Sequence, residues 1–223
     1  RGQEIIALQA ADVTIASGEY VAVVGASGSG KTTLLSMLGG MLSPTSGEVL
    51  LDGQSLFALA VAQRAALRRE KIGFVFQTFN LVPYLSAVEN VQVPLFLAKM
   101  TAAQQQQRAE DLLTQVGLAD RFHHKPSELS IGQQQRVALA RTLANDPPII
   151  LADEPTGNLD PDSREMVLDF FYQFHAQGRT IIMVTHDPAA AGRAGRTLCL
   201  SGGEILSGAE RPGSEPRLAK ISA

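Results

Sequence analysis

The stretch "VAVVGASGSGKTTLL", Val21 to Leu35, decides the fold, because it joins a strand to a helix through a turn rich in glycine. Val21 to Val24 is a continuous apolar run of the kind that forms buried strands. Lys31 to Gly40 has the pattern of a helix. A buried strand followed at once by a helix is typical of α/β proteins with a parallel sheet.

The turn in this stretch follows the pattern G-x-x-x-x-G-K-[ST], from Gly25 to Thr32. At average residue frequencies, a chain of this length matches the pattern by chance about one time in a hundred. Glycine lets backbone N–H groups curl around phosphate oxygens without a Cβ in the way. Lys31 can reach the β- and γ-phosphates of a nucleotide, and the Thr32 hydroxyl can coordinate Mg²⁺. The residues predicted to hold phosphate are Gly25, Ala26, Ser27, Gly28, Ser29, Gly30, Lys31, Thr32 and Thr33.

Two acidic residues, Asp153 and Glu154, end the apolar segment 149–153. Ligands of parallel-sheet proteins bind at the carboxyl ends of strands, so Asp153 fits a Mg²⁺-binding role. Glu154 could polarise the water that attacks the γ-phosphate, but adjacent strand residues point to opposite sides. We therefore expect the turn that begins at Pro155 to reorient Glu154. A solvated turn is the alternative for two acidic residues at this position.

Gln77 and His186 also end predicted strands, at 72–77 and 180–186. The Gln77 amide could contact Mg²⁺ or the attacking water. His186 precedes an Asp-Pro pair, which is a plausible helix start. Taken alone, Gln77 would be a surface polar residue, and His186 would be a capping or core histidine.

A second anion site is predicted in "ELSIGQQQRVALAR", residues 128–141. Ser130 is a good N-cap candidate, and apolar residues from Val137 onward supply a buried stripe. A helix that begins in this way offers unpaired backbone N–H groups and the positive end of its dipole to an anion. These residues by themselves do not identify the anion.

The composition predicts an ordinary globular protein. The chain has 223 residues, 45% of them hydrophobic and 18% charged, with a formal net charge of −3, which weighs against a nucleic-acid partner. No apolar run approaches the ~20 residues that cross a bilayer, and no signal peptide is visible. The single cysteine, Cys199, excludes an internal disulfide and is expected to be a small buried hydrophobe.

The chain is expected to form one α/β domain. Residues 4–24 have a strand–turn–strand pattern, which predicts an antiparallel β portion at the N-terminus. Helices between buried strands predict a mostly parallel sheet, and a run of helical patterns interrupts that alternation as an inserted subdomain. The expected parts of the single domain 1–223 are a core at 1–80 and 146–208, a helical subdomain at 81–145 and a loosely ordered tail at 209–223.

Five segments stand in one order along the chain: "GASGSGKTT", "FQ", "LSIGQQQR", "ILADEPTGNLD" and "VTH". This set resembles the nucleotide-binding subunit of ATP-binding cassette (ABC) transporters, across essentially the whole chain. "FQTFNLVPYLSAVENVQVPL" and "DEPTGNLD" are similar to the group that releases lipoproteins from the inner membrane or exports macrolides and peptides (LolD/MacB-type). The resemblance implies a P-loop NTPase fold that hydrolyses ATP with Mg²⁺.

The resemblance also implies a role for each position that matches a motif. Lys31 and the loop 28–33 would hold the phosphates of ATP. The implied catalytic and metal-binding residues are Glu154 as the base, His186 at the γ-phosphate and attacking water, and Thr32, Gln77 and Asp153 around Mg²⁺.

The same resemblance gives the second anion site a ligand. ATP would lie between the phosphate loop of one subunit and the signature residues Ser130, Gly132 and Gln133 of the other, in an ATP-dependent homodimer. Asp160 would belong to a loop that communicates between the two subunits. Segment 78–90 would face integral membrane permease subunits, which would hold the protein at the cytoplasmic face of the inner membrane.

Two other functions remain open from the residues. One is an ABC ATPase that regulates a non-transport membrane partner, such as a cell-wall or cell-division complex. The other is a soluble ABC ATPase that acts on DNA or ribosomes, although such proteins usually carry insertions that do not fit into 223 residues.

The chain departs from the family pattern at two places. Ile131 replaces the first glycine of the usual LSGGQ signature, and isoleucine strongly disfavours positive φ, so we expect an ordinary negative φ there. The family also stacks adenine on an aromatic residue shortly before the first strands. That position is expected to precede Arg1, and Tyr20 is not expected to replace it.

Overall fold

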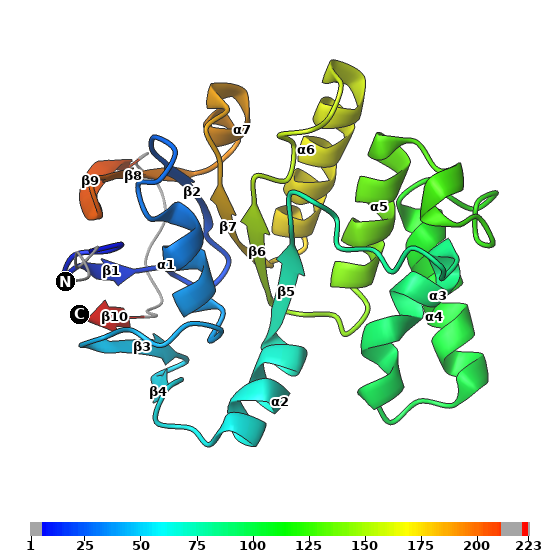
Figure 1. Ribbon diagram of the computed structural model, residues 1–223, viewed down its shortest axis with the longest axis horizontal. Coiled ribbons are helices and arrows are strands. Elements are labelled where there is room, and N and C mark those ends of the chain that lie inside the picture. The colour runs from blue at the N-terminus through cyan, green and yellow to red at the C-terminus, as the bar shows by residue number, and fades with distance from the viewer. Residues whose placement is uncertain (1–5, 211–219, 223) are drawn as a thin grey trace, which may run out of the picture.

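A computed structural model describes residues 6–210 and 220–222 and shows two sheets with helices packed around the larger one (Figure 1). The strands are β1 (Asp12–Thr14), β2 (Tyr20–Val24), β3 (Glu48–Leu51), β4 (Gln54–Ser55), β5 (Ile72–Val75), β6 (Ile149–Asp153), β7 (Thr180–Val184), β8 (Arg196–Ser201), β9 (Glu204–Glu210) and β10 (Lys220–Ser222). The α-helices are α1 (Lys31–Leu38), α2 (Val61–Lys71), α3 (Ala87–Gln92), α4 (Ala102–Gln115), α5 (Ile131–Thr142), α6 (Pro161–Ala176) and α7 (Pro188–Gly192), and the 3₁₀-helices are η1 (Val93–Leu97) and η2 (Pro126–Glu128).

The larger sheet has the strand order β5-β6-β7-β2-β8-β9. All of its neighbouring strands are parallel except the terminal hairpin β8–β9. In the register, Val23 of β2 and Asp153 of β6 both lie opposite Val184 of β7. The carboxyl ends of these strands therefore meet at one edge of the sheet, which confirms the predicted α/β class with a mostly parallel sheet.

The pleat of β2 divides the core between the two faces of this sheet. Val21 and Val23 point into a cluster with α1 and the smaller sheet. Tyr20 and Ala22 point to the opposite face, into a larger cluster that includes α3 to α6. Because successive strand residues alternate in direction, a continuous apolar run is what a strand buried on both faces requires.

The smaller sheet has the order β1-β10-β3-β4 and is antiparallel, which confirms the predicted antiparallel portion. The two strands expected in 4–24 do not pair with each other, because β2 lies in the larger sheet. Its first strand is shorter than the sequence suggests, since only Asp12–Thr14 pair as a strand. The loosely ordered tail expected at 209–223 needs a correction in the described residues. Residues 209–210 end β9, and 220–222 form β10 between β1 and β3, while 211–219 and 223 lie outside the described residues.

Helices α3, α4 and α5 pack on one another at the side of the larger sheet opposite the smaller sheet (Figure 1). Their buried residues join the same cluster as α6 and one face of the sheet. This group falls inside the segment 81–145 that the sequence predicts as a helical subdomain, although the exact bounds of that subdomain stay a prediction. None of the helices in the described part of the chain is long and apolar enough to cross a membrane.

Cys199 corrects a prediction, because it is exposed rather than buried. It lies on β8 between Leu198 and Leu200, which are both buried. Alternate residues of a strand face opposite sides, so the two leucines take the core face and Cys199 takes the other.

Candidate functional site

A cavity of about 690 Å³ opens at the carboxyl edge of the parallel strands. Loops that follow β2, β5, β6 and β7 all contribute to it, which is the expected position of a ligand in a sheet of this kind. The residues that line it are Ile6, Ala7, Gly25, Ala26, Ser27, Gly28, Gly30, Lys31, Thr32, Thr33, Gln77, Asp153, Glu154 and His186. Four separated sequence motifs therefore share one space.

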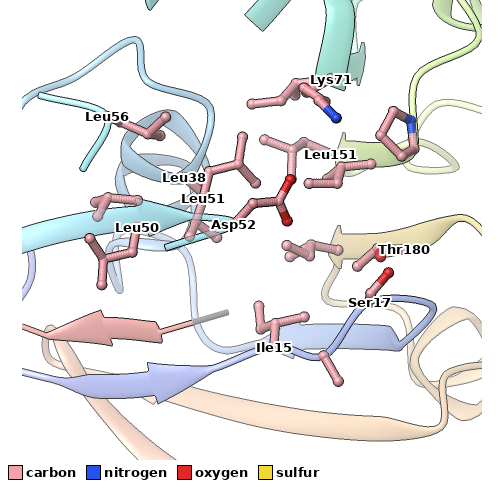
Figure 2. Close-up of a pocket in the computed structure, with 16 residues that line it drawn as sticks. Ile15, Ser17, Leu38, Leu50, Leu51, Asp52, Leu56, Lys71, Leu151 and Thr180 are labelled. Carbon is pink, nitrogen blue, oxygen red and sulfur yellow. The ribbon is translucent and has the colours of Figure 1, made fainter. Parts of the chain in front are cut away.

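A second cavity, of about 290 Å³, lies at the opposite ends of the strands and does not suit a nucleotide phosphate (Figure 2). It is enclosed by the β3–β4 hairpin and by the first residues of β5, β6 and β7. Its walls are mostly leucine and isoleucine side chains, with Asp52 and Lys71 among the few charged ones. The polar chemistry of the chain is concentrated in the larger cavity.

Backbone geometry requires glycine at several positions of the phosphate loop. Gly28 and Gly30 have φ values of 76° and 103°, in the left-handed region that favours glycine. A Cβ on Gly25 would lie 2.1 Å from the carbonyl oxygen of Leu200. A Cβ on Gly30 would lie equally close, 2.1 Å, to the carbonyl oxygen of Ala7. The protein's own backbone thus excludes a side chain at both ends of the pattern.

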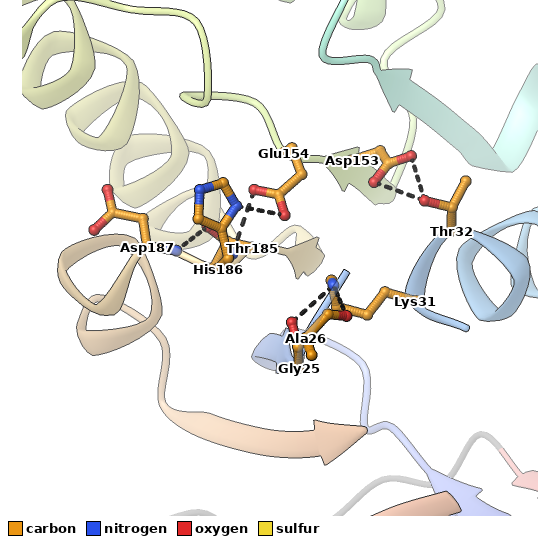
Figure 3. Close-up of polar contacts among 9 residues, drawn as sticks. All are labelled: Gly25, Ala26, Lys31, Thr32, Asp153, Glu154, Thr185, His186 and Asp187. Carbon is orange, nitrogen blue, oxygen red and sulfur yellow. Dashed lines mark hydrogen bonds and ion pairs between the residues drawn. The ribbon is translucent and has the colours of Figure 1, made fainter. Parts of the chain in front are cut away.

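Lys31, the first residue of α1, turns its ammonium back into this loop (Figure 3). Its Nζ donates to the carbonyl oxygens of Gly25 at 2.8 Å and Ala26 at 2.9 Å, and the residue is only 8% exposed. A mostly buried cation held by neutral carbonyls is available to a stronger acceptor, and a phosphate oxygen is one. Ser29 is buried beneath the loop rather than lining the cavity.

Thr32 and Asp153 meet across the cavity from α1 and the end of β6. The Thr32 hydroxyl donates to the carboxylate, at 3.0 Å from Oδ2 and 3.3 Å from Oδ1. Burial raises the pKa of the Asp153 carboxyl, and the hydrogen bond from Thr32 offsets part of that shift. A carboxylate and a hydroxyl are hard oxygen ligands that fit Mg²⁺, which usually takes one or two protein carboxylates and completes its shell with water and phosphate.

Glu154 reaches the cavity through its own backbone conformation. Its φ is 46°, a left-handed value that costs a residue with a side chain about 1–2 kcal/mol. This corrects the expectation that the turn at Pro155 reorients the side chain, since the reorientation occurs at Glu154 itself. The carboxylate contacts His186 Nδ1 at 2.9 Å and accepts the His186 backbone N–H at 3.3 Å (Figure 3).

Gln77 lies two residues beyond the end of β5, because the strand is shorter than predicted. Its backbone carbonyl oxygen accepts a hydrogen bond of 3.3 Å from the Asn158 side chain, which ties the loop after β5 to the loop after β6. Farther along this loop, Phe79 and Asn80 both have positive φ. Arg141 donates to their backbone carbonyl oxygens at 2.5 and 2.6 Å. Arg141 has no local signal in the sequence, because a single arginine in a helical pattern does not reveal a contact with a distant loop.

Ser130, Gly132 and Gln133 lie at the start of α5 and do not line the cavity of their own chain. Ser130 caps the helix as predicted, with the Gln133 N–H at 3.2 Å from its Oγ and its own N–H at 2.9 Å from Gln133 Oε1. A Cβ on Gly132 would lie 2.3 Å from Ser163 Oγ on α6, so close helix packing requires glycine there. Ile131 is the first residue of the helix and lacks positive φ, as expected.

Asp160 caps α6 and accepts the Ser163 N–H at 3.0 Å. Hydrogen bonds from the backbone and side chain of Ser163 lower the pKa of the Asp160 carboxyl.

Tyr20 is the first residue of β2, and its side chain is 1% exposed in the core, so it offers no stacking surface to a base. Ile6 and Ala7, which line the cavity, had no sequence signal that pointed to a site.

Comparison with known proteins gives consistent matches. A model of the ABC transporter family matches residues 8–157. A Hyphomonas neptunium protein named macrolide export ATP-binding/permease protein MacB is 48% identical over 204 residues, which are 92% of this chain and 32% of that protein. A Thermotoga maritima ABC transporter ATP-binding protein is 50% identical over 184 residues, 82% of this chain and 79% of that protein. The chain spans about a third of the length of the MacB relatives.

Two solved structures of the bacterial ABC transporter cassette MJ0796, both dimeric, have the same fold. One matches with a TM-score of 0.89 at 43% identity over 96% of this chain and 95% of that one. The other is a post-hydrolysis state bound to ADP and Pi, and it matches with a TM-score of 0.88 at 42% identity and the same coverage.

Proposed function

This chain belongs to the ABC transporter family of ATPases, and we propose that it is a nucleotide-binding subunit that dimerises around two ATP molecules to drive a membrane partner. The observation that carries the proposal is the cavity shared by Lys31, Thr32, Asp153 and Glu154. A buried cation, a pair of hard oxygen ligands and a second carboxylate in one space suit transfer of a phosphoryl group to water.

The phosphate loop would bind the triphosphate of ATP. The backbone N–H groups of Gly30 to Thr33 lie at the start of α1, where a helix leaves its first N–H groups unpaired and its dipole also favours an anion. Lys31 Nζ would exchange its two carbonyl acceptors for phosphate oxygens. The remaining loop residues, Gly25, Ala26 and Ser27, complete the cradle.

Glu154 would accept a proton from the water that attacks the γ-phosphate. His186, at 2.9 Å from its carboxylate, would hold that carboxylate in place and contact the γ-phosphate. Gln77 would orient the same water through its amide. Mg²⁺, held by Thr32 and Asp153 with Gln77 nearby, would neutralise charge on the phosphates.

The second subunit would complete each site. Ser130 and its neighbours do not reach the cavity of their own chain, and the exposed start of α5 can accept an anion from elsewhere. The two dimeric cassettes with the same fold support this arrangement. In a C₂ dimer, both composite sites form together, so ATP would close the dimer and hydrolysis would reopen it.

The membrane partner would be a pair of integral permease subunits of the lipoprotein-release or macrolide-export type, at the cytoplasmic face of the inner membrane. Relatives of this chain combine an ATP-binding part with a permease in one protein, which supports such a partner. Large apolar side chains at the helical end of the molecule are exposed: Tyr84 by 74%, Phe96 by 64% and Leu97 by 71%. Exposed apolar side chains of this size favour a protein contact.

The substitution Glu154→Gln tests the proposal. The variant should bind ATP but lose turnover by at least about 100-fold, because the amide cannot accept the proton from water. It should also accumulate as an ATP-bound dimer, since the step that reopens the dimer is blocked. Sedimentation with saturating ATP and Mg²⁺ measures this. A variant that stays monomeric would contradict the closure model, and one that keeps wild-type turnover would remove Glu154 from the role of base.

The type of partner needs its own experiment. Affinity purification from the native membrane, followed by identification of the co-purified subunit, should return an integral permease. A regulator of cell-wall or cell-division enzymes in its place would favour the non-transport alternative.

A further inference from the structure

Gln135 is a buried polar residue of α5 that lies outside the cavity. Its side chain is 0% exposed, and its Nε2 donates to the carbonyl oxygen of Pro155 at 2.6 Å. Pro155 directly follows Glu154, so this hydrogen bond fixes the loop next to the proposed catalytic base. The contact joins a helix and a loop that are 20 residues apart in the sequence.

The Gln135 amide is oriented by this one contact. Among the residues that the structure describes, none donates to its Oε1, which is buried. The opposite orientation would place two oxygen atoms 2.6 Å apart, so Nε2 must face Pro155. A buried acceptor without a partner costs stability, and an apolar side chain of similar volume would avoid that cost. The contact with Pro155 is therefore the feature that requires an amide at this position.

The loop around Glu154 is held from within and from outside: the Glu154 carbonyl oxygen accepts the Gly157 N–H at 3.1 Å, and its carboxylate contacts His186. Glu154 has a left-handed φ. Its N–H donates to the carbonyl oxygen of Val184 on β7 at 2.9 Å, which fixes the chain just before Glu154. Proline has no N–H, so the carbonyl is the one backbone group through which Pro155 can be held. Gln135 donates to that carbonyl oxygen and so ties the residue after Glu154 to α5.

We propose that Gln135 is a positioning residue that holds Glu154 in its catalytic conformation from the signature helix of the same subunit. This inference rests on the proposed ATPase function, because it acts through the proposed base. Gln135 lies five residues after Ser130, which is about 7.5 Å along a rigid helix. A shift of the helix when Ser130 binds the partner subunit's ATP would therefore reach the base of its own site.

The substitutions Gln135→Met and Gln135→Asn test the proposal. Met removes the amide at similar volume, and Asn keeps an amide that is one methylene too short to reach Pro155. Both variants should lose about 10- to 100-fold in kcat, because a small displacement of a catalytic group has an effect of this size. The KM for ATP and the Kd for a non-hydrolysable analogue should change less than about twofold, since the phosphate loop is untouched. If Met prevents folding, Asn carries the test.

Thr142→Val is the matched control. Thr142 is buried on the same helix, and its hydroxyl donates to the carbonyl oxygen of Phe74 at 2.7 Å, away from the Glu154 loop. This variant should lower the Tm, because it loses a buried hydrogen bond, and should leave kcat unchanged. A purely structural role for Gln135 would instead give the two variants the same kcat.

A double-mutant cycle with Glu154→Gln distinguishes the positioning role of Gln135 from the proposed ATPase function. If Gln135 acts through the carboxylate, Gln135→Met should not slow the residual single-turnover hydrolysis of Glu154→Gln any further. An equal fold-loss in both backgrounds would overturn the positioning role while leaving the proposed function intact. A wild-type protein without ATPase activity, or a Glu154→Gln variant with full activity, would instead contradict the proposed function.

Discussion

At the scale of one residue, Asp153 shows how a group in the site can lower the stability of the folded protein. Burial raises the pKa of its carboxyl, so the folded protein binds this proton more tightly than the unfolded chain does. Above that raised pKa the carboxylate is ionised and destabilises the fold. Below about pH 4, the ordinary value for Asp, the carboxyl is protonated in both states and the cost disappears.

We therefore expect Asp153→Asn to stabilise the protein in the absence of Mg²⁺ and nucleotide. Asparagine imitates the protonated carboxyl and can still accept the Thr32 hydroxyl. The Tm at pH 7 should rise, and the gain should shrink as the pH falls toward 4. Thermal unfolding measured at several pH values checks this, and a Tm that falls at pH 7 would contradict it. ATPase activity should be lost in the same variant.

At the scale of elements, the start of α5 shows that helix packing can require a residue of the signature motif. Gly132 is needed because α6 crosses so closely that a Cβ would lie 2.3 Å from Ser163 Oγ and 2.9 Å from Ser163 Cβ. Helix propensity alone favours alanine over glycine by about 1 kcal/mol, but a clash in a packed interface usually costs more.

Gly132→Ala should therefore destabilise the protein by about 1–3 kcal/mol. Ser163→Gly removes both clashing atoms and should restore much of that loss, as measured by urea unfolding. Gly192→Ala is the control, because a Cβ there meets nothing within 4 Å, and its effect should stay within about 0.5 kcal/mol. A Gly132→Ala variant as stable as the wild type would show that α6 yields to the new side chain.

At the scale of the whole molecule, one chain presents two separate surfaces that we propose bind phosphate. The loop around Lys31 lines the cavity, and the start of α5 at Ser130 lies outside it. Two copies in C₂ symmetry would bring each surface against the other's ATP. In this arrangement, one subunit would be enough to bind ATP, and hydrolysis would need both.

Ser130→Arg should consequently block ATP hydrolysis and leave ATP binding at Lys31 nearly intact. The long cationic side chain would occupy the space of the γ-phosphate from the partner subunit. Titration with a fluorescent ATP analogue measures binding, and phosphate release measures hydrolysis. Loss of both together would mean that Ser130 belongs to the site of its own chain.

Patterns among neighbouring residues are enough to predict the elements whose signals are local. The apolar run at Val21–Val24 identifies a buried strand, the glycine pattern identifies the phosphate loop, and Ser130 identifies a helix start. Each depends on residues a few positions apart, where backbone sterics and capping act directly. The resemblance to ABC ATPases, confirmed by the family match and the fold, rests on such segments in order.

The way in which distant residues act on one another depends on the packed three-dimensional structure. The left-handed φ of Glu154, the contact of Gln135 with Pro155 and the outward side of Cys199 have no local signature. Contacts from β7, α5 and Gly157 hold the loop around Glu154, and Cys199 faces outward because the core takes its neighbours. These features depend on contacts between segments far apart in the chain, and such contacts exist only when the sheet and helices have packed.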